Sequence, residues 1–147
     1  MKASTALALP LFVFYLCFVL TITLIERVPG DVPRYELELL WSYTDILHGR
    51  TGLIPEVFWN VVLFFPVGWI LSTCLPRKRE WWSVVIGMLL SIGIEVTQLI
   101  TRRGLFEFDD IFNNTLGTLI GWLMYLPWRW LAEAWERRTG GHRGRGG

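Results

Sequence analysis

Four long and nearly uncharged apolar segments constrain the fold of this chain more than any other feature. They are Ala6–Ile25, Val57–Leu75, Trp82–Ile100 and Ile111–Leu131. Apolar residues make up 52% of the chain, only slightly more than in an ordinary soluble domain, so their clustering is what matters. A helix of roughly 20 apolar residues spans the hydrocarbon core of a bilayer. The sequence therefore predicts an all-α integral membrane bundle of four transmembrane helices.

The first segment has a charged start at Lys2, as a signal peptide would. It is longer than the apolar region of a signal peptide, and no small-residue cleavage pattern precedes Glu26. We therefore expect an uncleaved helix.

The distribution of Lys and Arg predicts the orientation of this bundle. With both termini in the cytoplasm, nine of the 14 cationic residues lie on the inner side and five on the outer side. This excess follows the positive-inside rule. We expect a multi-pass protein of the cell membrane, in contact with membrane lipids and with both termini cytoplasmic. The balanced overall charge gives no reason to expect a nucleic-acid partner.

The predicted domain organisation is simple: a four-helix membrane domain over residues 1–131 and a basic, largely disordered cytoplasmic tail over residues 132–147. The outer loop, Glu26–Glu56, is the only sizeable soluble segment of the domain. Within it, Arg34–Leu47 places apolar residues on one helical stripe. This pattern predicts a short interfacial helix on the outer membrane surface, or alternatively an ordinary loop helix packed on the bundle.

Small residues recur on one face of two predicted helices. Gly117 and Gly121 form a GxxxG pair, and Gly87 and Ser91 form a similar pair. Such pairs let membrane helices approach each other closely. We interpret all four as packing residues, and we expect Gly117 and Gly121 to contact the backbone of another helix.

Polar and ionisable residues gather at the outer ends of three predicted helices. The candidate ligand-binding residues are Asn60, Glu95, Gln98, Arg102, Arg103, Asp109, Asp110 and Asn114. Glu95, Gln98 and Arg102 share one helical face. Ionisable groups at membrane depth are costly and mark functional sites by default. The alternative is structural: the carboxylates neutralise Arg102 or Arg103 and fix the helical hairpin in place.

Three segments carry a resemblance to a known family. They are NVVLFFPVGWIL (Asn60–Leu71), IEVTQ (Ile94–Gln98) and DDIFNNTLGTLIG (Asp109–Gly121), with arginines in the turn between the last two. In this order they resemble the VanZ-like family of bacterial membrane proteins. The turn is about one residue longer than usual, so Arg102 and Arg103 are both candidates for the family arginine. The resemblance implies a role at the bacterial cell envelope, since the family is named for a protein of teicoplanin resistance.

Three functions compete for this polar cluster. The first is an outward-facing cavity, with no cofactor, that binds a lipid-linked envelope intermediate or a glycopeptide-type ligand and modulates antibiotic tolerance. The second is a divalent-cation-dependent enzyme acting on a lipid phosphate, with Glu95, Asp109 and Asp110 as oxygen ligands. The sequence contains no HExxH, GxSxG or CxxC motif, which ranks the enzyme second. A transporter ranks last, because it would require oligomerisation to form a polar path.

Overall fold

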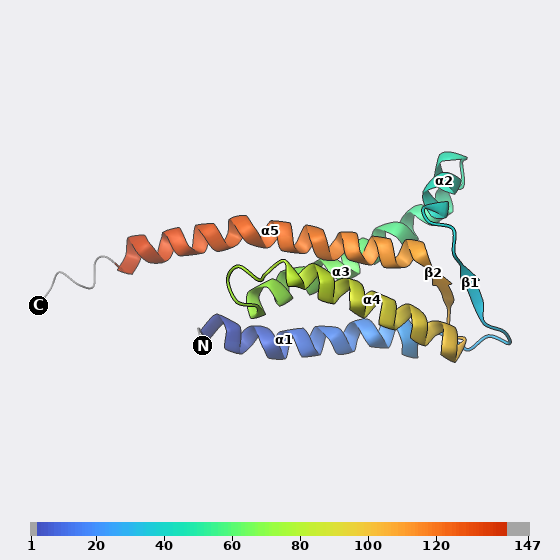
Figure 1. The fold of residues 1–147 in the computed structure, drawn as a ribbon, viewed down its shortest axis with the longest axis horizontal. Coiled ribbons are helices and arrows are strands. Elements are labelled where there is room, and N and C mark those ends of the chain that lie inside the picture. The colour runs from blue at the N-terminus through green and yellow to red at the C-terminus, as the bar shows by residue number, and fades with distance from the viewer. Residues whose placement is uncertain (1–2, 141–147) are drawn as a thin grey trace, which may run out of the picture.

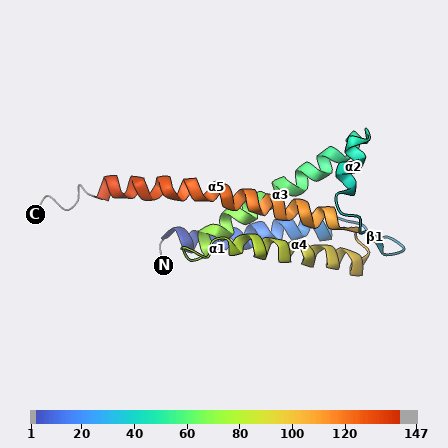
Figure 2. The same cartoon turned by 45° about the horizontal axis from the view of Figure 1, so that its top comes forward.

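The computed structural model describes residues 3–140, which form four long helices and a small group of elements at one end of them. In chain order the elements are α1 (Ala3–Leu20), continued by a π-helical turn (Thr21–Ile25), β1 (Arg34–Glu36), α2 (Trp41–Leu47), a 3-10 turn (Thr51–Leu53), α3 (Ile54–Cys74), α4 (Trp82–Thr101), β2 (Leu105–Glu107) and α5 (Phe108–Gly140). The four long helices run lengthwise through the molecule, with α3 inclined to the others, and β1, β2 and α2 gather at one end, called here the sheet end (Figure 1). At the other end α5 extends past the other helices (Figure 2).

Three helices in the described part of the chain are long and apolar enough to cross a membrane. They are Ala6–Ile25, Thr51–Cys74 and Trp82–Thr101, in agreement with the first three predicted spans. The fourth predicted span lies within α5 and is not among them; Asn113 and Asn114 are two of the polar residues that lower its hydropathy. The protein is therefore predominantly helical with three candidate spans, while the fourth span and the location of the termini remain predictions.

The prediction of an all-α fold needs one correction, because the sheet end contains a two-stranded parallel sheet. Arg34 pairs with Leu105 and Glu36 pairs with Glu107, so β1 and β2 come from distant parts of the chain. The helix predicted over Arg34–Leu47 consequently begins only at Trp41. Residues that pair in a sheet cannot join a helix, and Leu40 then turns the chain with a positive φ of 65°.

The domain boundary predicted at residue 131 lies within α5. α5 continues without interruption to Gly140, so residues 132–140 extend the helical part of the chain. Residues 141–147 of the predicted tail lie outside the described residues.

The close packing predicted for Gly117 and Gly121 is confirmed, and it takes place between α3 and α5. A Cβ atom added to Gly117 would lie 2.2 Å from the carbonyl oxygen of Val61, and one added to Gly121 would lie 2.1 Å from that of Phe65. Gly68 on α3 faces α5 in the same way. The absence of side chains on these glycines lets the two backbones touch. The helix pair with the most extensive contact in the fold is built on this seam.

The apolar core lies beside this seam, where α1, α3 and α4 meet. Val19, Phe64, Val67, Leu71 and Ile94 are buried against one another. Small polar side chains fill the remaining interior and bond across helices; the hydroxyl groups of Ser72 and Ser83, for example, form a hydrogen bond of 3.0 Å. Interhelical hydrogen bonds between small residues are a common means of association in membrane bundles.

Candidate functional site

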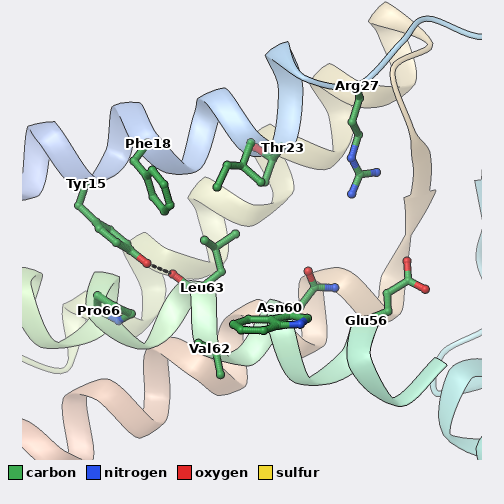
Figure 3. A pocket seen from close by; sticks show the side chains of 11 residues that line it. Tyr15, Phe18, Thr23, Arg27, Glu56, Asn60, Val62, Leu63 and Pro66 are labelled. Atoms are coloured by element: carbon green, nitrogen blue, oxygen red, sulfur yellow. Dashed lines mark hydrogen bonds between the residues drawn. The ribbon is translucent and has the colours of Figure 1, made fainter. Parts of the chain in front are cut away.

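A groove of about 610 Å³ lies between α1 and α3 and reaches the sheet end; we call it the α1/α3 groove. The part of the groove away from the sheet end is largely apolar, with Phe18, Ile22 and Leu63 among the lining residues. Three polar side chains line its other end: Arg27, Glu56 and Asn60 (Figure 3). Tyr15 lies at the end of the groove away from Arg27 and Glu56, and its hydroxyl donates a hydrogen bond of 2.8 Å to the carbonyl oxygen of Leu63 (Figure 3). The groove thus joins an apolar wall to a polar end.

A second cavity, of about 430 Å³, is lined in part by residues of β1 and β2 and is called here the sheet-end pocket. Its charged lining consists of three arginines and two glutamates, namely Arg27, Arg34, Arg103, Glu56 and Glu107. Arg27 and Glu56 also line the α1/α3 groove, so the two cavities share a wall.

Behind these cavities, most of the sequence-predicted site residues form separate, largely buried hydrogen bonds between elements, called here collectively the buried network. Asn60 donates to a carboxylate oxygen of Asp110, which joins α3 to α5. Glu95 is only 1% exposed and accepts a hydrogen bond of 3.0 Å from the backbone N–H of Glu107. The structure therefore brings together Asn60, Asp110 and Glu95 as supports for the sheet end.

Two further predicted residues connect α4 to its neighbours. The Gln98 amide donates to the carbonyl oxygen of Thr23 at 3.1 Å, and Asn114 donates to the Ser91 hydroxyl at 2.9 Å. Both side chains are buried. These bonds tie α4 to the end of α1 and to α5, which positions the walls of the cavities.

Asp109 binds the backbone of the loop that precedes α2. Its two carboxylate oxygens accept hydrogen bonds from the backbone N–H groups of Leu40 and Ser42, the latter at 2.8 Å. The neighbouring Tyr43 hydroxyl donates to the Asn113 side chain. This clamp holds the loop and α2 against the start of α5.

The two turn arginines bind backbone carbonyls, and neither pairs with Glu95. Arg102 ends α4 in a left-handed conformation, with φ of 57°, so its side chain leaves the helical face on which Glu95 lies. It donates instead to the carbonyl oxygen of Asp31 at 3.1 Å. Arg103 donates to the carbonyls of residues 24, 25 and 27 at 3.1–3.5 Å. Within residues 3–140, Glu95 forms no ion pair with an arginine.

The charged side chains of the cavities are mostly residues that the sequence analysis missed. Of the predicted site residues, Asn60 and Arg103 line a cavity; Arg27, Arg34 and Glu56 were not predicted. Glu56 carried a usable signal, because it lies one helical turn before Asn60 and shares its face. Arg27 follows the first apolar segment by two residues, on the side predicted to be poor in cations. A cation at this position departs from the positive-inside rule, and this departure was the signal in the sequence that could have identified Arg27.

The carboxylates of the proposed metal site point to different partners. Asp109 binds the backbone before α2, Asp110 binds Asn60, and Glu95 binds the backbone of β2. In the part of the chain that the structure describes, no group of three or more His, Cys, Asp or Glu side chains could hold a metal ion. The residues as arranged do not fit the divalent-cation site of the enzyme hypothesis.

Glu107, in β2, should make the stability of the protein depend on pH. Its carboxyl is 6% exposed, and burial, followed by the negative charges of Asp110, Glu56, Glu95 and Asp109, raises its pKa to about 8 from 4.5. Between these two values the folded state keeps a proton that the unfolded state releases. The free energy of unfolding should therefore fall by up to about 1.4 kcal/mol per pH unit over this window.

Thermal melting in detergent from pH 5 to 9 would measure this dependence. Glu107→Gln should make the decline less steep, whereas Glu38→Gln, at an exposed position, should leave it unchanged. An equally steep decline in Glu107→Gln and the native protein would contradict the assignment to Glu107.

Comparison with known proteins identifies the family. The family model described as VanZ/LLP1 matches residues 12–131, which includes the buried network and the α1/α3 groove. A curated relative, Protein VanZ from Enterococcus faecium, is 28% identical over 75 residues, which are 51% of this chain and 47% of the relative. The match thus spans about half the length of that protein. No solved structure matches the chain significantly. On the extent of the family match, this chain belongs to the VanZ/LLP1 family.

Proposed function

We propose that this VanZ-family protein spans the bacterial cell membrane four times, with both termini in the cytoplasm and the sheet end outside. The split of nine inner and five outer cationic residues supports this orientation. α5 supplies the fourth span: its 33 residues extend about 50 Å, against a hydrocarbon core of about 30 Å. In this orientation both cavities open at the outer leaflet.

The function that the geometry supports best is binding of an amphiphilic envelope ligand, either a lipid-linked envelope intermediate or a glycopeptide-type molecule with an acyl chain. One observation carries this proposal: the α1/α3 groove combines an apolar wall with a polar end. Ligand sites typically pair a mainly apolar lining with a few placed polar groups. Phe18 and Trp59, on the groove rim, are 47% and 63% exposed, so the groove is open toward the surrounding lipid.

We further propose that binding of this ligand modulates antibiotic tolerance. A membrane protein that sequesters such an amphiphile at the outer leaflet changes how much of it reaches its target. The family resemblance points to teicoplanin tolerance as the phenotype to measure.

The test is to fill the groove without disturbing the core. Val62 lines the groove and is 37% exposed, so Val62→Trp should occupy the groove at little cost to folding. The retained amphiphile, measured by native mass spectrometry, should be lost together with teicoplanin tolerance in cells that express the variant.

The matched control is Val96→Trp on α4. Val96 is 41% exposed and does not line the groove, so its replacement should change neither measurement. If Val62→Trp folds normally and keeps both the bound amphiphile and the tolerance phenotype, the groove is not the binding site.

A further inference from the structure

The α1/α3 groove and the sheet-end pocket adjoin each other and form one elongated site, which is mainly apolar in the groove and charged in the pocket. They meet at Arg27 and Glu56, which line both of them. On one side of this junction lies the apolar wall of the α1/α3 groove, and on the other side lie Arg34 and Arg103. A molecule placed along both cavities would have its chain among apolar side chains and its headgroup among guanidinium groups.

Arg27 is available for a ligand at this junction. Within residues 3–140 its side chain forms no ion pair and no hydrogen bond. It extends into the groove in the direction of Asn60 and Glu56 (Figure 3). Gly104 leaves room for it, because a Cβ atom there would lie 2.9 Å from Arg27 Nη1. Glu95 and Asp110, buried behind the junction, lie close enough to interact electrostatically with Arg27.

The backbone that carries the arginines is fixed by the fold. The Arg103 guanidinium binds three carbonyls at the end of α1, including that of Arg27, and so determines where the Arg27 side chain leaves the backbone. Arg34 is held in β1 by its pairing with Leu105. The three guanidinium groups therefore come from three segments whose relative positions are set before any ligand arrives, which lowers the entropic cost of binding.

We propose, building on the amphiphile binding inferred above, that the sheet-end pocket holds a phosphate group while the attached chain lies in the α1/α3 groove. Phosphate is a tetrahedral anion with several acceptor oxygens, so guanidinium groups from three segments can approach it from different sides. A carboxylate is planar and is satisfied by a single guanidinium fork. The arginines outnumber the glutamates in the pocket, and Glu107 opposes the anion little at neutral pH because its pKa is raised to about 8.

Three probes separate the contributions of the chain and of the phosphate: dodecyl phosphate, dodecanol and inorganic phosphate. The full chain in an uncharged maltoside detergent should bind dodecyl phosphate at least tenfold more tightly than either other probe. Arg27→Gln should weaken dodecyl phosphate binding about tenfold and leave dodecanol binding unchanged, which also shows that the variant is folded. The control is Arg50→Gln; Arg50 pairs with Asp45 and lines neither cavity, so binding should stay as in the native chain.

The outcomes distinguish this inference from the function on which it rests. Equal binding of dodecyl phosphate and dodecanol, unaffected by Arg27→Gln but lost in Val62→Trp, would overturn the phosphate assignment and leave the amphiphile site intact. Inorganic phosphate that binds as tightly as dodecyl phosphate would show that the two cavities do not act as one site. If neither alkyl probe binds, or if both bind Val62→Trp normally, the proposed function itself is wrong.

Discussion

Gly117→Ala should destabilise the protein by about 3 kcal/mol or more, because the added methyl group overpacks the contact between α3 and α5. The added Cβ would lie 2.2 Å from the Val61 carbonyl oxygen, which belongs to a helix backbone and cannot turn aside as a side chain can. α3 and α5 must therefore separate along the whole seam that Gly68 and Gly121 also form. Thermal melting in detergent, followed by circular dichroism, would measure the loss.

Gly93→Ala is the matched control for this prediction. Gly93 is also a helical glycine, on α4, but apart from its chain neighbours and the backbone of its own helix no atom lies within 4 Å of the position that its Cβ would take. The same substitution there should stabilise the protein by up to about 1 kcal/mol, because alanine favours the helix over glycine. Equal melting temperatures for Gly117→Ala and Gly93→Ala would show that α3 and α5 are packed less closely than described.

Asp109→Ala should release the outer loop from the bundle and lower stability by about 3 kcal/mol. The Asp109 carboxylate is 1% exposed and accepts hydrogen bonds from the backbone of Leu40 and Ser42. Its removal leaves these two N–H groups without their acceptor in a partly buried place. Protease cleavage within residues 37–50 should become much faster than in the native chain, in parallel with a lower melting temperature.

Asp45→Ala separates this effect from the loss of a surface charge. Asp45 lies in the same loop region and pairs with Arg50, but both side chains are partly solvent-exposed. Exposed ion pairs contribute about 0–1 kcal/mol, so cleavage and melting should change little. Slow cleavage of Asp109→Ala would mean that the loop is held mainly by the β1–β2 pairing.

The features that the sequence predicted well depend on local periodicity. The first three spans follow from uninterrupted apolar runs, and the seam glycines follow from the spacing of Gly117 and Gly121 on one helical face. Such patterns can be recognised from residues that lie close together in the sequence. The burial of Glu95 and Asp110 on the interior side of their helices could be anticipated for the same reason.

The remaining features depend on contacts between distant segments, which no local pattern encodes. The pairing of β1 with β2 joins two stretches of only three residues each, too short to show an alternating pattern. Arg102 continues the helical face of Glu95 in the sequence, yet α4 ends one residue earlier and directs it elsewhere. Arg27 gains its place only because Arg103, far along the chain, binds the carbonyls around it.

The parallel pairing of β1 with β2 has a consequence for how the protein is made. The loop after α1 leaves the ribosome long before its partners; Asp109, for instance, follows Leu40 by 69 residues. At about 5–20 residues per second, the loop waits several seconds with its strand edge unpaired while α3 and α4 are synthesised. The sheet-end pocket therefore cannot be completed until β2 has been synthesised. A nascent chain that stalls before β2 would carry the three candidate spans and an incomplete sheet-end pocket.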